Sequence, residues 1–162
     1  MKKIFLMRHA KSSWKDSNIP DHDRPLKKKG EKDVKAMGKL LKSKKLGPDV
    51  ILCSSATRAK ETAKLFKDTI KYEGKIEYID KLYMAEVPDL VSAIQSTPKK
   101  AKSVMVIGHN PGLEAFLQML TGKVETLPTS TIAYISVPID DWTELNSEVE
   151  GKLKKLWRPK DL

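Results

Sequence analysis

The feature that most constrains this chain is an alternation of short apolar runs with segments whose apolar residues recur at helical spacing. Runs such as "DVILCSS" (residues 49–55) and "SVMVIGH" (residues 103–109) are almost continuously apolar, as is typical of strands buried on both faces of a sheet. Between such runs, segments such as residues 30–45 place an apolar side chain on one face at each turn. This order predicts a three-layer α/β/α sandwich with a mainly parallel sheet.

The same patterns predict where the individual elements lie. Strands are expected at residues 3–9, 49–55, 75–83, 103–109, 131–139 and 152–159. Helices are expected at residues 30–45, 56–70, 88–96 and 110–122. We expect Asn110 to cap the last helix and Gly122 to follow its end. No repeat or linker divides the sequence, so we expect a single domain over residues 1–162.

The composition is that of an ordinary globular protein. Hydrophobic residues make up 40% and charged residues 32% of the 162 residues. No apolar run approaches the roughly 20 residues that cross a bilayer, and the apolar stretch near the start is shorter than a signal-peptide core. The one cysteine, Cys53, lies in an apolar run and is expected to be buried. We therefore expect a cytoplasmic location.

The formal net charge of +10 indicates that the surface attracts anions. Lysines gather in three short runs, at residues 27–29, 42–45 and 99–102. Aromatic residues do not interleave with these runs as they would in a stacking platform for single strands, so the runs are interpreted as solvated surface. We expect neither a nucleic acid nor a membrane as partner. We also expect the protein to be a monomer.

Three of the predicted strands end in side chains that bind or transfer phosphoryl groups. The first ends in Arg8 and His9, the second is followed by Arg58, and the fourth ends at His109. Parallel sheets bind ligands at the carboxyl ends of their strands, so these side chains are expected to converge. Each is weak evidence alone, since Arg58 could be a helix-surface arginine and His109 a residue bonded to backbone.

Together these residue types suit phosphoryl transfer through histidine. A guanidinium offers a planar fork of donors that matches phosphate oxygens. A neutral imidazole can attack phosphorus with one nitrogen if the other is held as an N–H donor, and nearby arginine charge lowers the pKa of such a ring. A second, protonated histidine can stabilise a developing oxygen charge. The sequence has no metal-ligand spacing, and no cofactor or metal is expected.

Three motifs carry a family resemblance: "LMRHAKS" (residues 6–12), "SSATRAKETA" (54–63) and "VIGHNPG" (106–112). In this order they resemble the histidine phosphatase superfamily, which includes the phosphoglycerate mutases and shares their fold. Ala10 stands where most members have glycine. With the small size, "DRPLKKKG" (residues 23–30) and the ending after "LWRPKDL", the chain is similar to the SixA-type phosphohistidine phosphatase branch.

The resemblance implies a role for each matching residue. His9 matches the nucleophile that becomes transiently phosphorylated, Arg8 and Arg58 match the arginines that bind the phosphoryl oxygens, and His109 matches the second histidine, which stabilises the transition state. Two further residues match positions near the phosphate in some members, namely Arg24 and Ser12.

Glu86 has two interpretations that the sequence leaves open, a general acid for the leaving group or a solvated loop residue. His22 is interpreted as a loop residue, and Ser54 and Ser55 as caps of the helix that follows.

The predicted function is a phosphatase that acts through a phosphohistidine on His9, with a phosphorylated protein carrying phosphohistidine as the expected partner. One alternative is a phosphomonoesterase that acts on a small phosphorylated metabolite with the same site. The other is a basic binding module with a vestigial pocket, supported by the charge excess.

Overall fold

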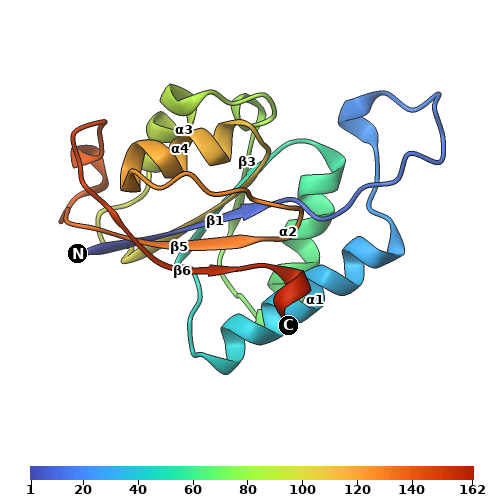
Figure 1. The fold of residues 1–162 in the computed structure, drawn as a ribbon, viewed down its shortest axis with the longest axis horizontal. Helices are drawn as coiled ribbons and strands as arrows, with labels where there is room; N and C mark the ends of the chain where they lie inside the picture. Colours follow the sequence, from blue (N-terminus) through green and yellow to red (C-terminus); the bar gives the residue numbers. More distant parts are fainter.

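A six-stranded sheet forms the centre of the computed structural model, which describes residues 1–162. The strand order is β3-β2-β4-β1-β5-β6. Figure 1 shows β1, β5 and β6 side by side. The strands are β1 (Lys2–Arg8), β2 (Val50–Ser54), β3 (Ile76–Ile79), β4 (Ser103–Gly108), β5 (Ile132–Val137) and β6 (Lys152–Trp157). β1 to β4 run parallel, whereas β5 is antiparallel to both β1 and β6. The prediction of a mainly parallel sheet is confirmed.

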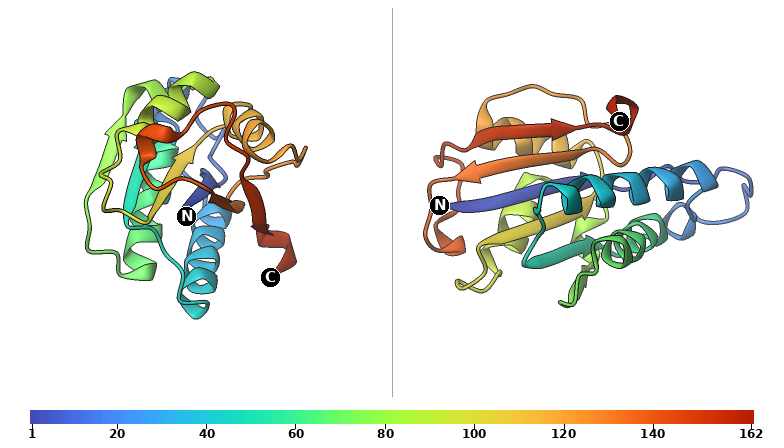
Figure 2. Two further views of the ribbon diagram at one scale, coloured as in Figure 1. Left: turned by 90° about the vertical axis from the view of Figure 1, so that its left-hand side faces the viewer. Right: turned by 90° about the horizontal axis from the view of Figure 1, so that it is seen from below.

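Four helices cover the two faces of the sheet and complete three layers (Figures 1 and 2). They are α1 (Lys28–Ser43), α2 (Thr57–Ile70), α3 (Val87–Gln95) and α4 (Gly112–Thr121). Successive side chains of a strand point to opposite faces, so Ile4 and Leu6 pack with α3 and α4, whereas Phe5 and Met7 pack with α1 and α2. This two-sided burial explains why the central strands are continuously apolar.

The helices and strands lie where the sequence predicts them, with small differences at their ends. The third strand is only four residues long and continues into a 3₁₀ turn at Asp80–Leu82. Gly122 follows α4 with a φ of 72°, as expected of a helix-ending glycine. The capping prediction for Asn110 is wrong, because Pro111 precedes α4 and the Asn110 amide donates to the carbonyl of Leu127 at 2.9 Å.

The exposure of the lysines agrees with the interpretation of the three lysine runs as solvated surface. Every lysine in the three runs is exposed, and Cys53 is fully buried. Three further 3₁₀ turns lie outside the main elements. Those at Asp21–Asp23 and Trp142–Glu144 are in connections, and that at Pro159–Asp161 follows β6. None of the helices is both long and apolar enough to span a membrane.

The strand order brings the ends of β1, β2 and β4 to one edge of the sheet. β4 lies between β2 and β1, with Cys53 paired to Ile107 and Arg8 paired to Gly108. The residues that follow these strands therefore emerge side by side, at a point where connections leave the sheet in different directions.

Gly112 allows α4 to start close to a neighbouring segment. A Cβ atom at this position would lie 2.4 Å from the carbonyl oxygen of Ala85 and 3.7 Å from the Leu90 side chain. The glycine is thus needed for close packing between the start of α4 and the loop before α3.

We predict that Gly112→Ala lowers the free energy of unfolding by about 1–3 kcal/mol, because backbone must move to admit the methyl group. The measurement is chemical denaturation at pH 7. Gly47→Ala is the matched control, since no atom lies within 4 Å of a Cβ there. Equal stability of the two variants would contradict this packing.

Candidate active site

The two histidines predicted at strand ends lie next to each other. His9 follows β1 directly and donates its backbone N–H to the carbonyl of Gly108 at 3.0 Å. His109 follows Gly108, so the two imidazole rings leave adjacent strands at the same level. Their centroids are 4.9 Å apart, with planes inclined by 51°.

A hydrogen bond fixes which nitrogen of His9 carries the hydrogen. Nδ1 lies 2.7 Å from the carbonyl oxygen of Ala10, which can only accept, so Nδ1–H donates. Burial lowers the pKa of His9 to about 4, against the opposing effect of the Ala10 bond and aided by the charges of Arg58, Arg8 and Arg24. At neutral pH the ring is uncharged, and Nε2 carries a free lone pair.

His109 is half-buried and is also neutral. Burial lowers its pKa to about 3, with further lowering by His9 and Arg58. Its Nε2 lies 2.7 Å from the hydroxyl oxygen of Ser54, at the end of β2. A protonated second histidine was the expectation, whereas with this lowered pKa the ring is a neutral donor or acceptor.

Two arginines are anchored beside these rings. The Nη1 group of Arg8 donates to the carbonyl of Leu127 at 3.1 Å. Arg58, in the first turn of α2, donates from Nη1 to the carbonyl of Asp21 at 2.7 Å and from Nη2 to the Asp21 carboxylate at 3.1 Å. Their guanidinium groups are thereby held in fixed positions near His9, and Arg58 is only 7% exposed.

Unpaired buried polar atoms gather at this same edge of the sheet. Six of the seven such side-chain atoms belong to residues at or beside the strand ends: Arg8 Nε, Arg58 Nε, His109 Nδ1, Asn110 Oδ1, Ser130 Oγ and Thr131 Oγ1. Buried polar groups normally have hydrogen-bond partners. A bound oxyanion is a ligand that would supply acceptors to the unpaired nitrogens.

Arg24 and Ser12 are buried and contact each other in the wall of the site. Arg24, on the loop after β1, donates from Nη1 to the Ser12 hydroxyl and from Nε to the Asp21 carboxylate at 3.1 Å. Its guanidinium stacks on the exposed ring of Trp14, 3.5 Å from the ring centre. The loop therefore holds a third guanidinium close to His9.

Two adjoining cavities open at this edge. One, of about 320 Å³, is lined by Arg8, His9, Lys11, Ser12, Trp14, Arg24, Arg58, His109, Asn110 and Thr129. The other, of about 390 Å³, shares Arg58, His109 and Asn110 with the first. Glu86 lines this second cavity and is exposed, and its backbone N–H donates to the Asp89 side chain at the start of α3. His109, Arg58 and Asn110 therefore lie between the two cavities and line both of them.

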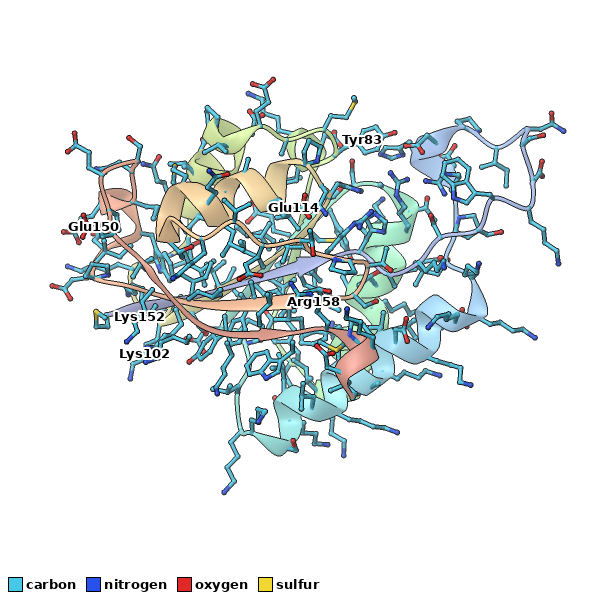
Figure 3. The ribbon with its side chains drawn as sticks, in the orientation of Figure 1. Tyr83, Lys102, Glu114, Glu150, Lys152 and Arg158 are labelled. Atoms are coloured by element: carbon cyan, nitrogen blue, oxygen red, sulfur yellow. The ribbon has the colours of Figure 1, made fainter.

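Sequence reasoning missed three residues of this arrangement: Asp21, Ser54 and Tyr83. The Asp21 carboxylate accepts bonds from Arg24, Arg58 and the Tyr83 hydroxyl, and the Tyr83 bond contributes most to lowering its pKa to about 2. Figure 3 shows Tyr83 beside the segment that carries Asp21. The only signal in the sequence was the closeness of Asp21 to Arg24 in "PDHDRP".

Ser54 was interpreted as a helix cap, and that interpretation is incomplete. Its hydroxyl oxygen does accept the N–H of Ala56, the residue before α2, at 3.2 Å. It also contacts His109, a contact between two strands that sequence spacing does not indicate. Ser55 makes no cap; its hydroxyl lies 3.0 Å from Nε2 of His22.

Comparison with known proteins agrees with this site. Residues 4–83 match the model of the histidine phosphatase superfamily (branch 1). An uncharacterised chloroplastic protein of Arabidopsis thaliana is 34% identical over 153 residues, covering 88% of this chain and 70% of that protein. The chain belongs to the histidine phosphatase superfamily.

Solved structures place it near one group within that superfamily. SixA from Nakamurella multipartita, a proposed phosphohistidine phosphatase, superposes with a TM-score of 0.85 at 25% identity, covering 98% of this chain and 96% of that one. Its counterpart from Agrobacterium tumefaciens gives 0.84 at 27% identity, covering 98% of both chains. The chain is a phosphatase that is similar in structure to these SixA proteins.

The depressed pKa values of the two histidines predict a pH dependence of stability. An exposed histidine has a pKa near about 6.5, so between about pH 6.5 and 4 the unfolded chain binds more protons than the folded chain. The free energy of unfolding should therefore fall as the pH is lowered through this range, by up to about 1.4 kcal/mol per pH unit for each ring.

Urea denaturation between pH 4.5 and 7.5 measures this slope. His9→Asn is expected to flatten it, whereas His22→Asn, which changes a half-buried histidine outside the pair, serves as control. Equal slopes of unfolding free energy against pH for His9→Asn and the original protein would show that the buried His9 ring does not cause the pH dependence.

Proposed function

We propose that the protein hydrolyses phosphohistidine on a protein substrate through a transient phosphohistidine at Nε2 of His9. The observation that carries the proposal is the Nδ1–H bond from His9 to Ala10, which leaves a free Nε2 lone pair amid unpaired buried donors. A neutral imidazole with its other nitrogen held as donor is a competent nucleophile toward phosphorus. The roles proposed for the other site residues follow from the role of His9 as nucleophile.

In the first step, the Nε2 lone pair of His9 attacks phosphorus and the bond from phosphorus to the substrate imidazole breaks. If the second ring nitrogen of that imidazole already carries a proton, it leaves as a neutral ring. Negative charge spreads over the phosphoryl oxygens in the transition state, and Arg8, Arg58 and His109 stabilise it. No proton has to be delivered to the leaving nitrogen.

In the second step, water attacks phosphorus and the bond to His9 breaks. The water hydrogens remain with the released phosphate, as dihydrogen phosphate. His9 regains its Nε2 lone pair, and its Nδ1–H still donates to the Ala10 carbonyl. Both steps use the same oxygen contacts, so one set of donors serves both transition states. Arg24 and Ser12 add further substrate contacts in the wall of the His9 cavity.

Exposed apolar side chains at the mouth support a protein substrate. Trp14, 75% exposed, lines the cavity of His9, and Met84, 82% exposed, lines the adjoining cavity. Away from the chain ends only Tyr78 and Val124 are comparably large and exposed. Apolar side chains placed around a binding site are typical of surfaces that contact other proteins. The SixA names of the similar structures agree with this assignment.

Hydrolysis of small phosphate esters is the second candidate, and the position of Glu86 favours it. An ester oxygen needs a proton as it leaves, and Glu86 lines the cavity adjoining that of His9. The two candidates therefore differ in their need for this carboxyl group.

Covalent labelling tests the nucleophile. Incubation with phosphoramidate should phosphorylate the protein with acid-labile, base-stable label, because a phosphorus–nitrogen bond forms on a histidine. His9→Ala is expected to remove the label and His22→Ala to retain it, with folding checked by circular dichroism. Persistent label in a folded His9→Ala protein would exclude His9 as nucleophile, and no label from any donor would favour a binding module.

Glu86→Gln separates the two substrate classes. We predict that hydrolysis of a phosphohistidine peptide changes less than about twofold, while hydrolysis of the matched phosphoserine peptide falls by about 100-fold or more, as expected when a general acid is removed. Glu77→Gln, an exposed carboxyl group on β3, is the control. Equal loss on both peptides would show that Glu86 is not acting as an acid.

A further inference from the structure

Ser54 occupies a position from which it can control His109. It is the last residue of β2 and is fully buried. Because Cys53 pairs with Ile107 in β4, Ser54 lies at the level of Gly108, directly before His109. Its hydroxyl oxygen is 2.7 Å from Nε2 of His109, a short contact between two uncharged groups.

Counting donors and acceptors favours one direction for this bond. The Ser54 oxygen accepts the N–H of Ala56, and its own hydrogen has only Nε2 of His109 as an acceptor. If the hydroxyl donates, the one group left unpaired is Nδ1–H of His109. If Nε2–H donates instead, both the serine hydrogen and the Nδ1 lone pair are left unpaired and buried. The first arrangement leaves fewer unsatisfied groups.

We propose that Ser54 is a positioning residue that fixes the neutral tautomer of His109 with its hydrogen on Nδ1. This rests on the proposed function, since the acceptor for that hydrogen is an oxygen of the phosphoryl group. Ser54 lines neither of the two cavities and has no hydrogen bond to His9, so it acts through the His109 ring that it holds.

The two imidazoles are then held in complementary states by two local hydrogen bonds. The Ala10 carbonyl holds the hydrogen of His9 on Nδ1 and frees Nε2 to attack. The Ser54 hydroxyl occupies Nε2 of His109 and leaves its Nδ1–H as a donor. One ring becomes the nucleophile and its neighbour, 4.9 Å away, becomes a hydrogen-bond donor.

Nitrogen NMR of the imidazole rings tests the assignment on the free enzyme. The chain has only three histidines, so the long-range ¹H–¹⁵N spectrum of uniformly labelled protein at pH 7 is simple, and His109→Gln identifies the His109 signals. The expected result is a protonated Nδ1 and an unprotonated Nε2 on His109. In Ser54→Ala, the form protonated at Nε2 should become populated.

Activity provides the second readout. Ser54→Ala is expected to lower kcat for phosphohistidine hydrolysis by at least about tenfold, toward the roughly 100-fold loss seen when one donor to a developing oxyanion is removed, with a smaller change in KM. Ser55→Ala is the matched control, because Ser55 contacts His22 rather than His109, and both kcat and the His109 spectrum should stay unchanged.

A hydrogen on Nε2 of His109 in the original protein would overturn the proposal, as would a His109 tautomer that Ser54→Ala leaves unaltered. The spectrum of the original protein shows which nitrogen of His109 carries the hydrogen, even if Ser54→Ala does not fold. It requires no substrate, so a protein without phosphatase activity would refute the proposed function and leave the tautomer result standing.

Discussion

Pairing of β1 with β4 at the centre of the sheet is the constraint on which the candidate site depends. Arg8 pairs with Gly108, and the bond from the His9 N–H to the Gly108 carbonyl continues this register by one residue. Two imidazoles from segments 100 residues apart therefore leave the sheet together. A change of register by one residue would turn one ring to the opposite face, because side chains alternate along a strand.

Burial and positive charge then set the chemical state of these rings. Desolvation disfavours imidazolium, and the nearby guanidinium charges disfavour it further. Asp21 supplies a counter-charge to Arg24 and Arg58 without contacting either histidine. The site thus keeps its rings neutral and its arginines charged at neutral pH, a combination that suits attack on a phosphoryl dianion.

The sequence was sufficient to predict the layers and the convergence of four side chains. The continuous apolar runs, such as that around Cys53, reflect burial on both faces, and this periodicity is local information. The rule that parallel sheets bind ligands at the carboxyl ends of their strands predicted that Arg58 would lie near His9 if their strands were neighbours. The strand order that makes this so was not predicted and comes from the structure. The family motifs then indicated which roles to expect.

What escaped prediction depends on contacts between distant segments. Ser54 had an adequate local explanation as a cap, and its contact with His109 exists only because β2 and β4 are neighbours. Asp21 and Tyr83 meet from two loops whose paths no periodic pattern encodes. Asn110 resembled a helix cap because its residue type and position fit one. Its side-chain oxygen accepts no N–H of α4, however, and its side-chain NH2 group donates to a carbonyl in the loop before β5.

A crystal structure with bound tungstate tests the central claim most directly. The account predicts a tungsten centre within bonding distance of His9 Nε2, with its oxygens contacting Arg8, Arg58 and His109. Tungstate bound elsewhere, for example among Lys60, Lys64 and Lys67 in the separate cavity beside α2 and β3, with the strand-end cavity empty, would contradict it.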